Sequence, residues 1–248
     1  MSREFEVRRE VDLPASPDDV WTAITADPAA WMFPTGMEIP QGAEPPEGAP
    51  VQTWDPPHRL VIRTESPDGT FNALDYMIEA REGGTAHLRY VHSGILADGW
   101  EDQYDAIGSH TDFYLHTLGQ YLEHFNGRSV TYVGQPSDGI SGPASAGGPE
   151  AMDTLREALG ISSGAAVGDA VHAHLGGAGP LEGVIDYLTP EFIGIREPDG
   201  LWRFFGRNHY GGVVGMSAHI FRDDVDAPAS EAVLKAWLDD VYAAVRQS

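Results

Sequence analysis

The sequence contains no cysteine, and its single lysine, Lys235, stands against fourteen arginines. Without cysteine, disulfide bonds, thiolate nucleophiles, iron–sulfur clusters and zinc sites with cysteine ligands are excluded. Basic residues are scarce in general: 15 Lys and Arg face 38 Asp and Glu, for a formal net charge of −23. A surface of this sign repels phosphate backbones and anionic lipid headgroups. We therefore expect neither nucleic-acid binding nor binding to a membrane surface.

Long apolar runs are also absent. No stretch of about 18 apolar residues, the length of a membrane-spanning helix, occurs in the sequence. The segment from Met1 to Val11 is charged and alternating, and it lacks the apolar core of a secretory signal. These two features predict a cytoplasmic protein. Apolar residues make up 42% of the chain and aromatic residues 10%, which is enough to bury a core.

The acidity is spread over both halves of the chain. Up to Gly127 there are 7 basic and 22 acidic residues, and beyond it there are 8 and 16. A length of 248 residues suits two domains of about 120 residues each. We place the boundary at Gly127, so that the predicted domains span residues 1–127 and 128–248.

The stretch from Asp102 to Phe125 is the clearest predicted helix. It contains no proline, and Asn126-Gly127 follow as a stop signal. Its apolar positions recur at a three–four spacing, which forms one stripe along a helix. The residues of this stripe are Tyr104, Ile107, Thr111, Leu115, Leu118, Leu122 and Phe125. A helix of this kind needs an apolar surface to cover.

Predicted strands before this helix supply that surface. The two-residue period places Leu88, Tyr90 and His92 on the inward face of the last strand. A sheet with one apolar face must curl around the long helix to bury that face, which predicts an α+β helix-grip fold. The segment Thr35–Pro50, rich in Pro, Gly and Glu, interrupts the strands and is expected to form a loop or a poorly ordered hairpin. The predicted elements are strands Phe5–Leu13, Val51–Trp54, His58–Glu65, Phe71–Ala80 and Thr85–Ser93, and short helices Asp18–Thr25 and Pro28–Trp31.

Several local motifs accompany this pattern. They are Pro14–Trp21 after the first strand, Trp54–Leu60, Gly83–Thr85, His92–Gly94 and the terminal helix. In these motifs residues 5–126 resemble the START-like, birch-pollen-allergen-like (SRPBCC) superfamily, and within it the homologues of the heat-shock-protein-90 ATPase activator. The resemblance implies a helix-grip fold and lipid, polyketide or aromatic ligands. None of the motifs is a catalytic signature, and Thr35–Pro50 departs from the family pattern.

The second half echoes the first at an offset of about 133 residues. Val51–Arg63 aligns with Val184–Arg196, and Pro57 meets Pro190. We interpret the chain as two tandem, diverged helix-grip copies, with Gln135–Gly148 as a loop inside the second. An unrelated α+β extension is the alternative. The other predicted elements of the second copy are Arg128–Val133, Pro149–Leu159, Leu201–Asn208, Val213–Phe221 and the helix Ala229–Arg246.

Histidine and arginine patterns predict no metal or catalytic site. His172 and His174 would share one strand face, but no third ligand and no HExxH motif accompany them, so we expect surface histidines and no metal. His116 and His124 on the long helix are expected to face solvent. Arg203 is expected at a rim, because a buried arginine needs a carboxylate or an anionic ligand. No cofactor and no catalytic residue is predicted.

The aromatic residues of the predicted grip are the candidate ligand-binding residues. Rings with hydroxyl tips suit the wall of a pocket for a flat apolar molecule, although the same rings could simply fill the core. His92 is either a polar pocket group or a core histidine bonded to a backbone carbonyl. The candidates are Trp31, Phe33, Trp54, Tyr76, Tyr90, His92, Ile107, Thr111, Tyr114, Tyr187, Trp202 and Trp237.

Three functions remain open from the sequence. The leading hypothesis is a non-catalytic protein that binds a small hydrophobic or aromatic molecule. The second is a polyketide-type cyclase or dehydratase that uses an inward His or Tyr as general acid or base. The third, suggested by the activator homologues, is a protein-interaction module that modulates a chaperone ATPase. A protein partner or a homodimer is left open.

Overall fold

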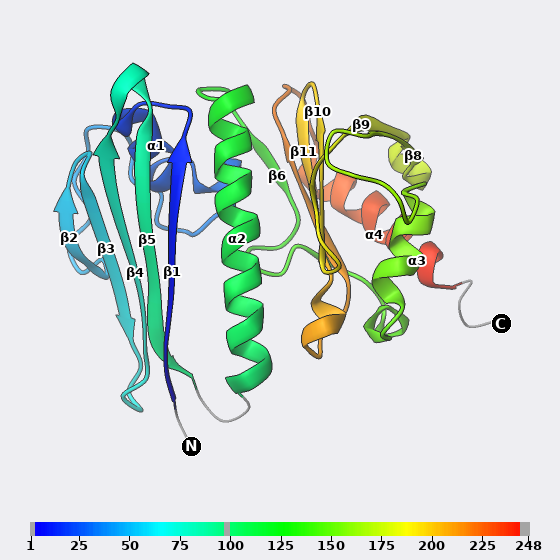
Figure 1. Cartoon of the computed structure of the whole chain (residues 1–248), viewed down its shortest axis with the longest axis horizontal. Coiled ribbons are helices and arrows are strands. Elements are labelled where there is room, and N and C mark those ends of the chain that lie inside the picture. The colour runs from blue at the N-terminus through cyan, green and yellow to red at the C-terminus, as the bar shows by residue number, and fades with distance from the viewer. Residues whose placement is uncertain (1–2, 97–99, 244–248) are drawn as a thin grey trace. The chain divides into compact units, whose positions relative to one another are not determined.

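The structure is a computed structural model that describes residues 3–96 and 100–243. The chain divides into two units, Met1–Asn126 and Gly127–Ser248. Each unit has an antiparallel sheet and a long C-terminal helix (Figure 1). No helix among the described residues is long and apolar enough to cross a membrane.

Unit 1 contains the predicted elements in the predicted order. In chain order they are β1 (Arg3–Leu13), α1 (Pro17–Thr25), η1 (Pro28–Ala30), β2 (Val51–Asp55), β3 (Arg59–Glu65), β4 (Phe71–Ala80), η2 (Glu82–Gly84), β5 (Ala86–Leu96) and α2 (Trp100–His124). The five strands form one sheet in the order β1-β5-β4-β3-β2. The first strand therefore pairs with the last strand of the meander, as a helix-grip fold requires.

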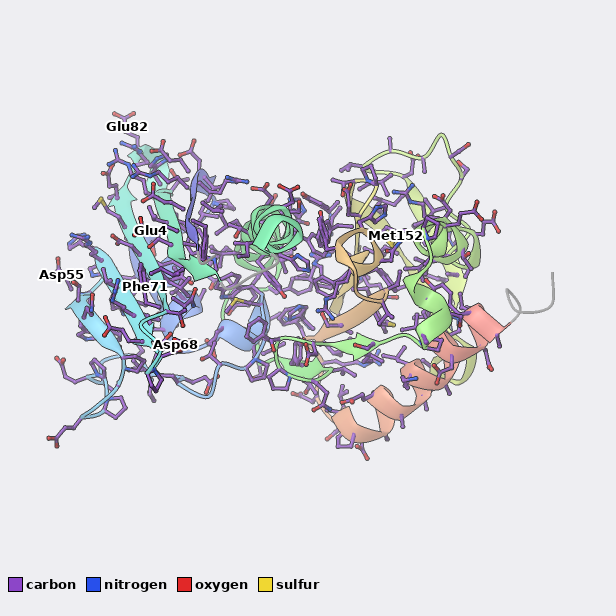
Figure 2. All side chains as sticks on the ribbon, turned by 90° about the horizontal axis from the view of Figure 1, so that it is seen from below. Glu4, Asp55, Asp68, Phe71, Glu82 and Met152 are labelled. Carbon is purple, nitrogen blue, oxygen red and sulfur yellow. The ribbon has the colours of Figure 1, made fainter. Side chains whose placement is uncertain are left out.

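Alternation along the strands makes one face of this sheet apolar. On β1, Phe5, Val7 and Leu13 are buried, whereas the intervening acidic residues are exposed. The same face continues across β5 and β4, where Tyr90 pairs with Tyr76. Successive side chains point to opposite faces of a strand, so burying every second residue produces this two-sided sheet. Figure 2 shows acidic side chains such as Asp55 and Glu82 at the outer edge of unit 1, pointing away from it.

The helix α1 starts as its sequence dictates. Ser16 caps it: its hydroxyl accepts the backbone N–H of Asp19 at 3.2 Å, and the Asp19 carboxylate accepts the backbone N–H of Ser16 at 3.3 Å. Pro17 occupies the first helical position, where its missing N–H costs nothing. The helix buries Val20 and Ile24. Its inner side lies over β4, on the part of the sheet that α2 leaves uncovered.

The long helix α2 runs beside β1 (Figure 1). The predicted stripe is buried at Thr111 and at every later position through Phe125, and Ile107 is half-buried. The side chain of Tyr104 lies outside the described residues. Because α2 packs along β1, the apolar face of β3 and β4 must be covered by something else. That cover is α1, η1 and the segment that follows.

Residues 31–50 contain no helix or strand; the loop was predicted for Thr35–Pro50, and the short helix predicted to reach Trp31 ends at Ala30. The segment is nevertheless fastened to the unit at Ile39, whose side chain is buried and whose N–H donates to the carbonyl of Thr25 at 2.8 Å. At its far end the carbonyl of Pro50 accepts the N–H of Arg63. Between these two points the chain arches over the sheet face. We call residues 31–50 the cover loop.

Unit 2 repeats the arrangement with additional elements. In chain order they are β6 (Thr131–Val133), β7 (Ile140–Ser141), η3 (Ala144–Gly147), α3 (Ala151–Ala158), β8 (Ala170–His174), η4 (Gly176–Ala178), β9 (Pro180–Leu188), β10 (Phe192–Glu197), β11 (Gly200–Phe205), η5 (Arg207–Tyr210), β12 (Gly215–Ile220) and α4 (Ala227–Ala243). The strand order is β6-β12-β11-β10-β9-β8, and β7 also pairs with β12. The chain is therefore an α+β protein with two helix-grip units in tandem.

The second unit agrees with the predicted echo and departs from it in detail. The hairpin β9–β10 turns at Pro190, as β2–β3 turns at Pro57. Gln135–Gly148 is not a plain loop, because it contains β7 and η3. A two-residue strand and a single 3-10 turn are too short to carry a periodic signal. The helix predicted as Ala229–Arg246 begins at Ala227, and its last residues, 244–246, lie outside the described part of the chain.

Side chains fill the space between the unit 2 sheet and its helices. One continuous cluster of buried apolar residues joins α3, α4 and the inner sheet face, with Met152, Phe204 and Leu238 among its members. Figure 2 labels Met152, a buried residue of α3. On α4, Tyr242 is buried and donates its hydroxyl to the carbonyl of Ala151 at 2.8 Å. Unit 2 is thus held by a packed core.

Candidate functional site

A cavity of about 550 Å³ lies in unit 1, on the apolar face of β3 and β4. Its floor is the sheet, its side is formed by Ile24 and Thr25 at the end of α1, and the cover loop lies over part of it. The cavity exists because α2 packs along β1 and the cover loop has no regular structure that could pack densely on the strands.

The cavity floor is a short ladder. Three cross-strand pairs share the inward face of β3 and β4: Leu60 with Tyr76, Ile62 with Leu74, and Thr64 with Asn72. At about 3.3 Å per residue the ladder is roughly 13 Å long. Leu60 and Tyr76 are buried, whereas Thr64 and Asn72 are exposed. The floor therefore runs from a buried apolar end to an exposed polar end, which we call the mouth.

The side wall and the cover are mostly apolar. Trp31 is buried, and its indole N–H donates to the carbonyl of Ala23 at 2.9 Å, so the ring is held in place. Met32, Met37 and Ile39 from the cover loop complete the enclosure. Flexible methionine side chains adapt to the outline of an apolar molecule. This wall can accommodate more than one ligand shape.

The polar groups of the cavity carry no formal charge. No Asp, Glu, Lys or Arg is among the described residues that line it. The hydroxyl of Thr25 donates to the carbonyl of Trp21 at 2.8 Å, and the hydroxyl of Thr64 donates to the carbonyl of Asn72 at 3.4 Å. An anionic ligand would therefore meet no counter-charge inside the cavity, and its desolvation would be uncompensated.

Two buried tyrosines stand at the closed end. The rings of Tyr76 and Tyr90 lie 5.0 Å apart, centroid to centroid, across β4 and β5. Burial raises the pKa of both phenols above their ordinary value, and the two hydroxyls hydrogen-bond to each other. Both phenols are thus neutral near neutral pH. Their rings fill space and their hydroxyls can hydrogen-bond, but neither supplies a phenolate that could act as a base.

His92 lies directly behind the mouth. Its Nε2 is 2.5 Å from Oδ1 of Asn72, and its ring packs edge-on against Phe5 with centroids 5.1 Å apart. Burial lowers the pKa of His92 from 6.5 to about 4, so the imidazole is neutral at neutral pH. The predicted inward orientation beside Tyr90 is confirmed by a centroid distance of 6.4 Å. Its partner is a side-chain carboxamide rather than a backbone carbonyl.

The structure brings together only part of the predicted ligand-binding set. Trp31 and Tyr76 line the cavity, and Tyr90 and His92 stand behind it. The other members of the set in unit 1 are placed elsewhere: Phe33 and Tyr114 pack against each other, Trp54 packs on Trp21, and Ile107 and Thr111 lie on α2. In unit 2, Trp237 belongs to the core cluster, Trp202 packs against it, and Tyr187 pairs with Gly194 across β9 and β10.

Most residues that line the cavity were not among the predicted candidates. The cover-loop residues Met32, Met37 and Ile39 follow no periodic pattern, so no sequence signal marks them. Ile62 and Leu74 could have been found, because the alternation that sends Tyr76 inward also sends residues two positions away inward. The aliphatic positions of the strand face that carries Tyr76 therefore complete the floor of this cavity.

The predictions for histidine and arginine residues outside this cavity were partly wrong. His172 and His174 are exposed, as predicted, and no group of three potential ligands among the described residues is placed to hold a metal ion. Arg203, however, is buried and not at a rim. Its Nη1 lies 3.0 Å from both carboxylate oxygens of Asp186, which is also buried. The carboxylate that a buried arginine needs comes from the neighbouring part of the sheet, on β9.

Comparison with known proteins adds no family assignment. No protein-family model matches the chain, and no curated protein does. Among solved structures, the chain is similar to DynU16, a protein of the dynemicin biosynthetic locus, at 17% identity over 96% of both chains with a TM-score of 0.38. About half of it is similar to MLL2253 from Mesorhizobium loti (18% identity, 49% of this chain and 98% of the other, TM-score 0.39). Aha1 from Colwellia psychrerythraea, solved as a dimer, gives 17% identity over 50% of this chain and 99% of the other, with a TM-score of 0.39. Similarities this low transfer neither a ligand nor an activity.

Proposed function

We propose that unit 1 binds an uncharged, mostly apolar small molecule in the cavity between β3, β4 and the cover loop. The observation that carries the proposal is a pocket of about 550 Å³ lined by Trp31, Ile62, Leu74 and the cover-loop methionines. Ligand pockets in proteins usually measure about 300–1,000 Å³ and combine such walls with a few polar groups. A ligand that fills the space would bury apolar surface that water otherwise wets.

The groups around the cavity favour binding over catalysis. A general acid or base must come within hydrogen-bond reach of the substrate. His92 stands behind Asn72 rather than in the lining, and its pKa of about 4 makes it a weak base at neutral pH. Tyr76 does line the cavity, but burial raises its pKa and disfavours proton transfer. The cyclase or dehydratase alternative therefore lacks a group suited to the task among the described lining residues.

The chaperone-modulating alternative rests on the sequence resemblance alone. Protein-binding surfaces commonly expose contiguous apolar side chains. Among the large apolar side chains that the structure describes, Val167 is the one that stands strongly exposed, at 60%. A single exposed valine does not favour a docking site. We therefore retain ligand binding as the proposed function.

The test uses the full chain and the uncharged fluorophore N-phenylnaphthylamine. We expect its fluorescence to rise on binding and its saturation to raise the unfolding temperature. A ligand at 100 times its dissociation constant stabilises the folded state by about 2.7 kcal/mol. Absence of both signals at saturating probe would contradict the proposal.

A pair of variants on β3 localises the binding. Ile62→Trp places an indole inside the cavity, whereas Val61→Trp places the same indole on the opposite sheet face. Because the two positions are adjacent on β3, the larger side chain should perturb the strand itself to a similar extent in both variants. We expect Ile62→Trp to abolish probe binding and Val61→Trp to retain it. Equal loss in both variants would place the probe outside the cavity.

A further inference from the structure

The mouth of the cavity presents a fixed set of polar atoms. Thr64 and Asn72 face each other across β3 and β4, and both are exposed. The hydroxyl hydrogen of Thr64 is directed to the backbone carbonyl of Asn72. A hydroxyl oxygen has two lone pairs, so Thr64 still offers an acceptor to a ligand.

The orientation of the Asn72 side chain depends on His92. A carboxamide has an acceptor oxygen on one side and two N–H donors on the other. The Nε2 of His92 lies 2.5 Å from the oxygen, so a neutral imidazole with its proton on Nε2 donates to it. With the oxygen engaged on the His92 side, the two N–H groups of Asn72 are left for the mouth.

The imidazole itself is held from two sides. Phe5 on β1 packs edge-on against it, and Tyr90 stands two residues away on the same face of β5. Val7 pairs with His92 on β1, and Leu74 pairs with it on β4. The ring is thus confined among apolar neighbours, and burial favours its neutral form. Among the residues that the structure describes, Asn72 is the one whose side chain hydrogen-bonds to Nε2 of His92.

We infer that His92 is a positioning residue: it turns the Asn72 carboxamide so that the mouth offers N–H donors beside the Thr64 acceptor, and the cavity thereby selects uncharged hydroxy-ketones. The inference rests on the proposed function. The ligand carbonyl accepts from Asn72, and a hydroxyl on a neighbouring carbon donates to Thr64. The apolar remainder of the ligand lies along the floor toward Tyr76.

Carboxylates are selected against by the same arrangement. Unit 1 carries a large excess of acidic residues, and no described lining residue supplies a positive charge. A carboxylate at the mouth would accept from Asn72, but it would face the Thr64 oxygen with no proton to donate. It would also enter a negative field. An anionic ligand of equal shape should therefore bind more weakly than a hydroxy-ketone.

The test compares three probes of one shape on the full chain. They are a hydroxyflavone whose hydroxyl neighbours its carbonyl, the flavone without that hydroxyl, and the flavone with a carboxylate in its place. We expect the hydroxyflavone to bind about three- to tenfold more tightly than the flavone, the range that one hydrogen bond provides. The carboxylate should bind more weakly than both. The excited-state proton-transfer emission of the bound hydroxyflavone reports whether its hydroxyl donates to the protein.

Variants separate positioning from structure. Asn72→Asp removes the donors at nearly constant shape, and His92→Phe removes the group that turns them. Because both flavones share the carbonyl, Asn72→Asp and His92→Phe should weaken the binding of each by about three- to tenfold, and His92→Gln, which restores an N–H donor, should recover it. Thr64→Val, which removes the acceptor of the ligand hydroxyl, should reduce the preference for the hydroxyflavone to about onefold. N-phenylnaphthylamine, which needs no carbonyl contact, should lose less affinity than the flavones in the three variants at Asn72 and His92. Asn72 is exposed, so its variant is expected to fold even where a His92 variant does not.

The outcomes are distinguishable. Flavone binding that weakens in Asn72→Asp and recovers in His92→Gln, together with a hydroxyflavone preference that disappears in Thr64→Val, supports the inference. If N-phenylnaphthylamine binds but the hydroxyflavone is not preferred, or Asn72→Asp leaves flavone binding intact, the inference is overturned and the proposed function stands. If N-phenylnaphthylamine does not bind at all, both are overturned.

Discussion

Arg9 on β1 and Asp112 on α2 form a two-armed ion pair between the sheet of unit 1 and its long helix. Nη2 of Arg9 donates to Oδ2 of Asp112 at 2.9 Å, and Nε of Arg9 donates to Oδ1. Arg9 occupies an inward position of β1, where an apolar residue would be expected, and it pairs with Tyr90. Its charge is therefore tolerated because Asp112 meets it at the sheet–helix boundary. The pair fastens α2 along β1 and leaves the face of β3 and β4 to the cover loop.

Breaking this tether should weaken unit 1 modestly. The two side chains are about 35% and 43% exposed, so water screens their attraction. Asp112→Asn should lower the free energy of unfolding by about 1 kcal/mol, at the upper end for partly exposed pairs. Urea denaturation measures the change. The control is Arg8→Gln on the opposite face, whose exposed pair with Glu6 should contribute almost nothing. Equal effects of the two variants would contradict a tethering role.

Gly194 on β10 should not tolerate a methyl group. A Cβ atom there would lie 2.1 Å from Oδ1 of Asp186 and 2.7 Å from Nη1 of Arg203. Gly194→Ala must therefore displace the buried ion pair, and we expect a loss of about 2–4 kcal/mol, as for overpacked cores and disturbed buried charges. The control is Gly164→Ala, where a Cβ meets no atom within 4 Å and the change should stay within about 0.5 kcal/mol. Thermal unfolding distinguishes the two.

Replacing one partner of the Asp186–Arg203 ion pair should lower the free energy of unfolding more than replacing both partners. Burial lowers the pKa of Arg203, and the adjacent Asp186 carboxylate works against that shift. Asp186→Asn leaves a buried guanidinium without its counter-charge and should cost about 3–5 kcal/mol. The double variant Asp186→Leu/Arg203→Met should recover most of that loss. If the double variant were as unstable as the single one, at least one of the two charged groups would make a stabilising interaction outside the ion pair.

The stability of unit 1 should depend on pH through His92. Its pKa is about 4 in the folded protein and ordinarily 6.5, so the unfolded chain binds more protons between these values. Stability should therefore be complete above pH 6.5 and fall as the pH is lowered from 6.5 toward 4. Because the ring is partly exposed, solvent screening should limit the loss to roughly 1–2 kcal/mol. Denaturation curves at several pH values measure it.

The His92→Gln variant provides the comparison for this pH dependence. Glutamine keeps a hydrogen-bond donor toward Asn72 but does not titrate. The decline between pH 6.5 and 4 should therefore shrink in this variant. The matched control is His172→Gln, at an exposed position of β8. An unchanged decline in His92→Gln would assign the pH dependence to other groups.

Much of the fold was predictable because it follows from local periodicity. The three–four spacing of α2 and the alternation of β1 and β4 depend on the geometry of a single element, so the sequence suffices to read them. The capping residues Ser16 and Pro17 marked the start of α1 for the same reason. In the second half, the turn at Pro190 placed β9 and β10 in the correct order. Short elements such as β7 were not predicted, because two residues are too few to show a periodic pattern.

The candidate site was less predictable because its parts are far apart in the chain. Trp31 and Tyr76 were expected in the site and line the cavity, but the expected contribution of Ile107 and Thr111 did not materialise in that cavity. The sequence located an apolar sheet face, not the helix position that decides which part of the face stays open. The burial of Arg203 was missed likewise, since its partner Asp186 lies seventeen residues earlier on another strand.

By itself, the amino-acid sequence determined that this chain is acidic, lacks thiol chemistry and alternates its side chains so that sheets with one apolar face must close on long helices. Such properties are set by composition and by residue spacing within one element. Only the tertiary structure decided that the cavity lies under residues 31–50, that Asn72 meets His92 at its mouth, and that Arg203 meets Asp186. These contacts join residues from different elements, and packing between elements, not the pattern within any one of them, brings them together.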